Sequence, residues 1–166
     1  MQTIICMKWG SRYGSEFVNR LHDSIKRHTK RKTRLYCFTD NNKGIDNGVI
    51  CKPLPKIKLP ETISLTPWRK LSVWQCPLYD LTGDVLFLDL DLVITGNLDR
   101  FFDFKPGKYC VIENWTQIGK NIGNTSCFRF PVGKYDFIFK KFQNNPEKVW
   151  KKFHIEQTFL SFEIKD

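Results

Sequence analysis

The chain begins with an alternation of apolar segments that predicts a strand, a helix and a second strand. Thr3–Met7 is a continuous apolar run with β-branched side chains, which is typical of a buried strand. A stripe of apolar residues at helical spacing follows over residues 17–25, with Ser15 as the expected N-cap. Arg34–Thr39 then predicts another strand before a turn-rich segment. The order strand, helix, strand predicts a parallel βαβ unit.

The rest of the chain continues the same alternation. Asp84–Leu88 contains four consecutive apolar residues, which predicts a strand buried on both faces, as in the centre of a parallel sheet. Residues 52–67 hold four prolines and predict a loop. The other expected elements are helices at 68–75, 98–102, 134–142 and 154–162 and strands at 109–112 and 127–130. We therefore expect one α/β domain over residues 1–166, with a central, mostly parallel sheet flanked by helices.

Composition narrows the class of protein. Hydrophobic residues make up 41% of the 166 residues, which excludes a disordered chain, and the longest apolar runs are far shorter than the ~20 residues of a membrane span. The six cysteines contain no Cys-x-x-Cys pair, which favours reduced thiols. Together with the absence of a basic, apolar leader, this predicts a cytoplasmic protein.

The net charge of +10 is unevenly distributed. Residues 80–104 carry six acidic side chains and one basic side chain, so an acidic island lies within a basic chain. The most basic run is Lys26–Arg34, which could be a solvated helix end or a peripheral contact with an anionic membrane at its inner surface. No nucleic-acid-binding motif accompanies this run, so no nucleic-acid partner is expected.

Asp89 and Asp91 carry the candidate chemistry. In an extended backbone the two side chains point the same way, so two carboxylates converge at the carboxyl end of a buried strand, where ligands of open α/β sheets bind. Like charges at this distance favour a shared divalent cation, and Mg²⁺ or Mn²⁺ held by two carboxylates keeps positions open for phosphate oxygens. Two solvated acids would be the alternative. A calcium EF-hand is excluded, because its sixth and twelfth loop positions hold Ile94 and Arg100.

A phosphatase of the haloacid-dehalogenase type is a closer competitor, because it also begins with an apolar strand followed by D-x-D-x-(T/V). That family places its motif near the N-terminus and needs a later pair of acids for magnesium. No such pair follows residue 103.

The segment Asp84–Phe102, DVLFLDLDLVITGNLDRFF, resembles the D-x-D segment of GT-A-type glycosyltransferases, above all their glycogenin-like branch. The resemblance implies that Asp89 and Asp91 hold Mn²⁺ or Mg²⁺, which bridges the diphosphate of a nucleotide-sugar donor, with a UDP-sugar favoured. The acceptor would be a hydroxyl group of a glycan or a lipid-linked sugar. A Rossmann-like GT-A domain is the fold that this resemblance implies.

Carried over position by position, the resemblance also implies further site residues. Lys70, or its neighbour Arg69, would approach the donor phosphates or sugar. Glu156 would be a general base in an inverting enzyme, whereas Gln157 would line the reacting face in a retaining one, and the sequence leaves this choice open. The remaining donor-binding candidates are Lys8, Trp9, Tyr13, Asp40, Leu90, Asn121 and Asn124.

One departure from the glycogenin-like pattern concerns the metal. That branch takes a third ligand from a histidine motif near its C-terminus, and nothing comparable follows Ser161. Either the chain lacks a C-terminal segment, or His154, water or substrate completes the coordination. The same acids could also serve a Mg²⁺-dependent phosphohydrolase or nucleotidyltransferase, or be structural in a basic binding module.

Overall fold

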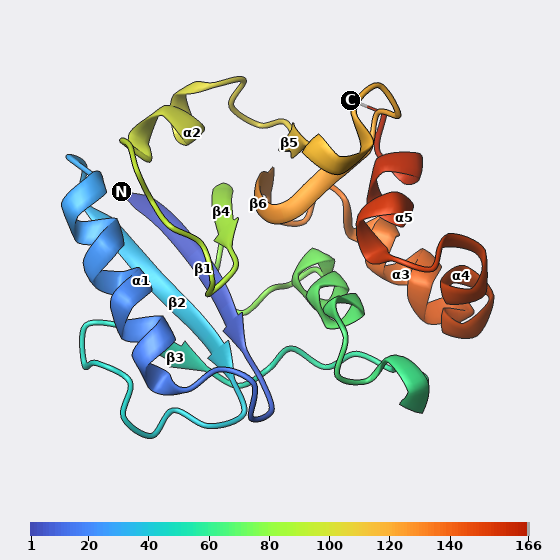
Figure 1. Ribbon diagram of the computed structural model, residues 1–166, viewed down its shortest axis with the longest axis horizontal. Helices are drawn as coiled ribbons and strands as arrows, with labels where there is room; N and C mark the ends of the chain where they lie inside the picture. The colour runs from blue at the N-terminus through green and yellow to red at the C-terminus, as the bar shows by residue number, and fades with distance from the viewer. Residues whose placement is uncertain (166) are drawn as a thin grey trace.

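A computed structural model, which describes residues 1–165, shows a six-stranded sheet at the centre of the protein (Figure 1). The strand order is β3-β2-β1-β4-β6-β5; β1 to β4 are parallel, and β6 runs antiparallel to both β4 and β5. The predicted α/β domain with a mostly parallel sheet is confirmed. The strands are β1 (Gln2–Lys8), β2 (Thr33–Thr39), β3 (Ile50–Lys52), β4 (Asp84–Leu88), β5 (Cys110–Glu113) and β6 (Gly123–Pro131).

Helices cover both faces of the sheet. One face packs against α1, and the other packs against the 3-10 helix η2 with α3 and α5 (Figure 1). The α-helices are α1 (Ser15–His28), α2 (Asp99–Asp103), α3 (Asp136–Asn144), α4 (Pro146–Phe153) and α5 (Glu156–Glu163), and the 3-10 helices are η1 (Glu61–Ile63), η2 (Pro67–Trp74) and η3 (Trp115–Gln117). Within residues 1–165, no helix is both long and apolar enough to cross a lipid bilayer.

Strand β4 is buried on both faces, as its uninterrupted apolar sequence predicts. Val85 and Phe87 belong to the cluster under η2, whereas Leu86 and Leu88 belong to the cluster under α1. All four side chains are at most 1% exposed. Burial of such side chains stabilises a fold by roughly 1.5–3 kcal/mol each, so the position of this strand is firmly fixed by the core.

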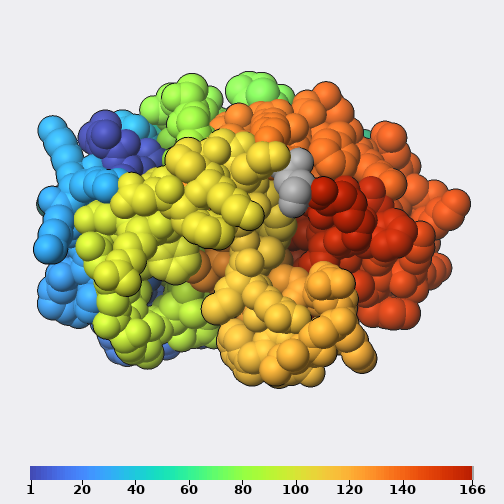
Figure 2. Space-filling model, turned by 90° about the horizontal axis from the view of Figure 1, so that it is seen from above, coloured from blue at the N-terminus to red at the C-terminus, as the bar shows by residue number. Residues whose placement is uncertain are grey.

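The carboxyl ends of β1, β2 and β4 lie at one edge of the sheet because these strands are parallel. The connection of the β5–β6 hairpin lies at that same edge, and the pairing of its strands shifts register between Val111 and Ile112. Leu88, the last residue of β4, pairs with Cys127, whereas the hairpin continues to the pair Glu113 and Gly123. Figure 2 shows the connection between β5 and β6, in gold, as a lobe that projects at the lower edge of the view.

Several local features differ from the sequence predictions, among them the unpredicted short elements β3, η1 and η3. Ser15 is the first helical residue of α1 rather than its N-cap, which is Gly14 in an extended conformation without a side-chain cap. The short helix predicted at 68–75 is the 3-10 helix η2. Helix α4 was not predicted; Asn145 caps it by accepting a hydrogen bond from the Lys148 amide, and none of its residues is fully buried.

Candidate functional site

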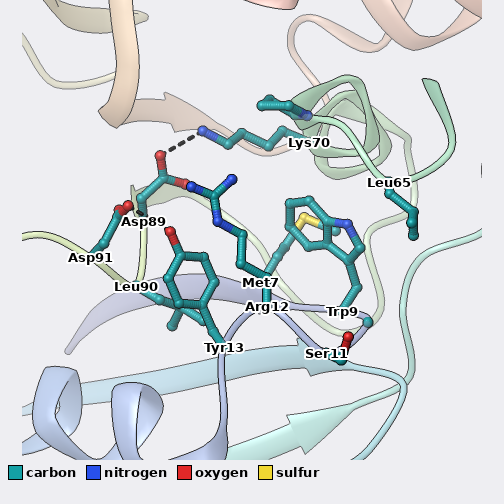
Figure 3. A pocket seen from close by; sticks show the side chains of 12 residues that line it. Met7, Trp9, Ser11, Arg12, Tyr13, Leu65, Lys70, Asp89, Leu90 and Asp91 are labelled. Atoms are coloured by element: carbon teal, nitrogen blue, oxygen red, sulfur yellow. Dashed lines mark hydrogen bonds and ion pairs between the residues drawn. The ribbon is translucent and has the colours of Figure 1, made fainter. Parts of the chain in front are cut away.

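A hollow of about 470 Å³ opens at the carboxyl edge of the sheet (Figure 3). Its walls come from the loop after β1, the segment that leads into η2, and the turn after β4. The lining residues are Met7, Trp9, Gly10, Ser11, Arg12, Tyr13, Leu65, Pro67, Lys70, Asp89, Leu90 and Asp91. The predicted carboxylate pair therefore lies in a hollow at the edge of the sheet where ligands of this fold class bind.

A turn, rather than a continued strand, brings the two carboxylates into the same hollow. Strand β4 ends at Leu88, and the Asp89 amide donates one more ladder hydrogen bond to the Ser126 carbonyl (2.9 Å). The chain then turns at Leu90, whose side chain is buried in the cluster under α1. This burial anchors the turn, and Asp91 follows it at the surface.

Lys70 is the direct partner of Asp89. The Lys70 Nζ donates to Asp89 Oδ2 at 2.6 Å and to the Thr125 carbonyl at 3.3 Å. The side chains are 7% and 21% exposed, so the pair is largely removed from water. Burial raises the pKa of Asp89 above its ordinary value, and the Lys70 ammonium opposes this rise. The carboxylate therefore depends on a neighbouring cation.

Tyr13 is the partner of Asp91. Its hydroxyl donates to Asp91 Oδ2 at 2.7 Å, and this hydrogen bond, together with burial, raises the pKa of Tyr13. The phenol therefore stays protonated at neutral pH and acts as a donor that orients the carboxylate. Each acid of the pair thus has one fixed donor and further oxygen lone pairs.

The chemistry of this donor set fits a hard divalent cation. Mg²⁺ and Mn²⁺ prefer carboxylate oxygens, and two such groups leave coordination positions for water and phosphate. Among the described residues, the hollow contains no other acid and no histidine, so the pair supplies the protein ligands found there. A separate group, His22, Asp23 and Asp46, has ligand atoms within 4.8 Å of one another, but it belongs to α1 and the loop before β3.

Two other predicted donor residues support the loop after β1 rather than line the hollow. The Lys8 Nζ donates to the Asn41 carbonyl at 3.2 Å, and Asp40 Oδ2 accepts from the Gly10 amide at 2.8 Å. Gly10 has a φ of 62°, a conformation that favours glycine. The loop that carries Trp9 and Tyr13 is therefore fixed at both its start and its turn.

Glu156 does not line the hollow that contains the carboxylate pair, but hydrogen bonds connect it to Asp89. It is 2% exposed, and the Thr125 hydroxyl donates to its Oε1 at 2.6 Å. Since the Thr125 carbonyl accepts from Lys70, Glu156 is connected to Asp89 through two residues. It lines a neighbouring hollow of about 400 Å³ together with His154, which is likewise outside the Asp89 hollow.

The remaining predicted residues lie elsewhere. Arg69 donates to the Ser64 carbonyl at 3.1 Å, and the Asn124 side chain accepts from the Ser126 amide at 2.9 Å. Asn121 lines a different hollow beside β5. Gln157 is half-buried on α5, where its carbonyl accepts a hydrogen bond from the Ser161 hydroxyl. The roles of all four in donor binding or catalysis remain predictions.

Sequence reasoning did not single out several lining residues. Arg12 lies within the loop Lys8–Tyr13, which the resemblance places at the nucleoside, but the residue itself was not named. Leu65 and Pro67 enter the hollow from the proline-rich segment, and no local pattern marks them. Their contribution depends on how η2 packs against the sheet.

Comparisons with known proteins show a likeness of structure. Neither a protein-family model nor a curated protein sequence matches the chain. Among solved structures, the galactosyltransferase LgtC, in complex with donor and acceptor sugar analogs, superposes with a TM-score of 0.68 at 13% identity, over 96% of this chain and 69% of LgtC. The glycosyltransferase GlyE of Streptococcus pneumoniae gives a TM-score of 0.63 at 16% identity, over 99% of this chain but 43% of GlyE.

These identities are low, and the likeness is one of fold. This chain combines a mixed sheet that contains the antiparallel β6 with a hollow at the carboxyl edge of the sheet. The D-x-D turn lines that hollow. The chain spans less than half the length of GlyE. In architecture, the protein has the GT-A-type fold seen in LgtC and GlyE.

Proposed function

We propose that the protein transfers a sugar from a nucleoside-diphosphate sugar, with a UDP-sugar favoured, to a hydroxyl group of a glycan or lipid-linked acceptor. The observation that supports this most directly is the carboxylate pair Asp89 and Asp91 in a hollow at the carboxyl edge of a GT-A fold. The buried Lys70 beside the pair adds a cation on the same side. Together these groups suit an anionic diphosphate bound through a divalent ion.

Asp89 and Asp91 would hold Mn²⁺ or Mg²⁺, which when bound acts as a Lewis acid on the diphosphate leaving group. The protein's own residues do the rest of the positioning. Tyr13 keeps Asp91 oriented, and Lys70 keeps the buried Asp89 ionised. Trp9 and Arg12 form the outer wall of the hollow, where an indole face and a guanidinium can contact a nucleoside and its phosphates.

Glu156 would act on the acceptor side. Its carboxylate is held by Thr125 and lines the neighbouring hollow together with Trp150, which is only partly buried and whose indole suits a sugar ring. In an inverting reaction Glu156 would accept the proton of the acceptor hydroxyl; in a retaining reaction Gln157 would line the donor's reacting face. The stereochemical outcome of the reaction distinguishes these two roles.

The proposal predicts that nucleoside diphosphates stabilise the protein only together with a divalent ion. UDP with Mn²⁺ should raise the midpoint of thermal unfolding, because a ligand at ~100 times its Kd stabilises by ~2.7 kcal/mol, whereas either component alone should have little effect. The measurement is a thermal-shift series with UDP, GDP and ADP, with and without Mn²⁺, followed by assays of UDP-sugar hydrolysis.

Other results would contradict the transferase. Release of phosphate from a monoester, without any Mn²⁺-dependent effect of nucleoside diphosphates, would indicate a phosphohydrolase. If neither phosphate release nor a Mn²⁺-dependent effect of nucleoside diphosphates is observed, the protein is a binding module in which the two acids are structural.

A further inference from the structure

The loop between β5 and β6 exposes large apolar side chains. Trp115 is 64% exposed and Ile118 is 76% exposed, although both are residue types that are normally covered. Across the hollow, Leu65 is 76% exposed, and Val93, two residues after Asp91, is 85% exposed. These four residues, which we call the apolar rim, all belong to loops at the carboxyl edge of the sheet.

Hydrogen bonds within the loop fix the conformation of the segment that carries Trp115 and Ile118. The Asn114 side chain caps η3 by accepting from the Thr116 amide (3.2 Å), and the Asn114 amide donates to the Ile122 carbonyl (2.7 Å). Glu113 Oε1 accepts from the Gly119 amide at 2.8 Å. The backbone thus closes on itself while its two largest apolar side chains point into solvent.

This loop starts at the same edge of the sheet as the carboxylate pair. Strands β4 and β5 run in the same direction with β6 between them, so their ends lie about 10 Å apart. Phe128 pairs with both Phe87 and Val111, so Glu113, two residues after Val111, is level with Asp89. The loop that follows Glu113 therefore begins at the same edge of the sheet as the carboxylate pair. In Figure 2 it forms the gold lobe next to the yellow-green segment that follows β4.

We propose that the apolar rim inserts into the interface of an anionic lipid bilayer, so that the hollow receives an acceptor presented at a lipid surface. This inference rests on the proposed transferase function. Three of the four side chains are aliphatic, which suits acyl chains better than a sugar ring, and tryptophan is the residue type that favours the boundary between headgroups and hydrocarbon. Exposed Arg12 and Lys120 in the same loops are balanced by exposed Asp91 and Glu113, so the attraction to an anionic surface comes from the net charge of +10 of the whole chain.

The basic run Lys26–Arg34 lies at the other edge of the sheet. It connects the end of α1 to the start of β2, and Arg31 is already engaged in two hydrogen bonds with Asp103, at 2.7 and 2.9 Å. A bilayer held at this run would face the edge opposite the hollow. The apolar rim places the lipid on the side where the carboxylate pair lies.

Vesicle binding tests the proposal without metal or nucleotide. Vesicles of phosphatidylcholine and phosphatidylglycerol (70:30) should bind the wild-type chain at low salt, and the double variant Trp115→Ser/Ile118→Ser should bind at least about tenfold more weakly. The emission of Trp115, obtained as the difference from Trp115→Phe, should shift to the blue and be quenched by brominated phospholipid. Phe104→Ser is the matched control, because Phe104 is 58% exposed and belongs to the segment between α2 and β5, whose Gly107 amide donates to Asp84 at the start of β4, the opposite edge.

The proposal is overturned if the wild-type chain ignores these vesicles at low salt, or if the double variant binds them as tightly as the wild type. A double variant that binds vesicles normally but loses transfer to a water-soluble sugar would identify the rim as a sugar platform and overturn the lipid assignment. Stabilisation by UDP with Mn²⁺ should be unchanged in the double variant, which shows that it is folded. If the chain binds vesicles through the apolar rim but is never stabilised by UDP with Mn²⁺, the membrane-binding role of the rim is kept and the proposed transferase function is rejected.

Discussion

Replacement of Asp89 by Asn is expected to remove Mn²⁺-dependent UDP binding and to lower sugar transfer by at least about a hundredfold. Substitutions of groups that merely support a metal ligand typically cost 10–100-fold in metal affinity or activity, and loss of a ligand itself should cost more. Asparagine keeps the shape of the side chain and can still accept a hydrogen bond from Lys70. The change keeps the shape of the turn but leaves the buried Lys70 ammonium without its counter-ion, so the free energy of unfolding of the variant is measured as well.

The measurements are Mn²⁺ titration by calorimetry in the presence of UDP and the initial rate of transfer or donor hydrolysis. Asp103→Asn is the matched control, because Asp103 is an exposed aspartate on α2 that pairs with Arg31 away from the hollow. It should bind UDP and Mn²⁺ like the wild type. Asp91→Asn should resemble Asp89→Asn in binding, and wild-type Mn²⁺ affinity in both would refute the carboxylate pair as the metal site.

The fold could be predicted from the sequence where every side chain of a strand is buried, on both faces of the sheet. The segment Val85–Leu88 predicts a strand covered on both faces, and it is such a strand. Helix α4 escaped prediction because its sequence, PEKVWKKF, is short and strongly charged. It has eight residues against the fourteen of α1, so its apolar pattern spans only about two turns.

The sequence pattern alone placed only those site residues that are neighbours in the chain, whereas Trp9, Tyr13 and Lys70, which also line the hollow, came from the family resemblance. Asp89 and Asp91 could be placed from one short motif, although a turn at Leu90 rather than strand alternation orients them. The link from Glu156 through Thr125 to Lys70 joins three distant parts of the chain. Such a network depends on how α5 and η2 pack against β6, and no local pattern encodes that packing.

Replacement of Lys70 by Met should destabilise the protein by about 2–3 kcal/mol at neutral pH. Breaking a buried ion pair by removing one partner typically costs 3–5 kcal/mol, and the 21% exposure of Asp89 reduces this figure. Methionine fills a similar volume, so most of the loss comes from the carboxylate left without its cation. Lys26→Met is the control, because its exposed pair with Asp23 should contribute less than about 1 kcal/mol.

The pH dependence of this loss has a definite sign. Burial raises the pKa of Asp89 above its value in the unfolded chain, and removal of Lys70, which opposes that rise, should raise the pKa further. Between the two pKa values the folded state binds more protons than the unfolded state, so the free energy of unfolding falls as pH rises through that interval. The deficit of Lys70→Met is therefore largest at neutral pH and should shrink as the pH is lowered through the pKa of Asp89.

Urea unfolding at several pH values, with and without Mn²⁺, measures both effects. A divalent ion at Asp89 and Asp91 would replace the missing positive charge, so Mn²⁺ should stabilise Lys70→Met more than the wild type. The double variant Lys70→Met/Asp89→Asn should recover much of the lost stability and lose the response to Mn²⁺. A deficit that grows on acidification, or that persists unchanged in the double variant, would show that Lys70 acts through packing rather than as the counter-ion of Asp89.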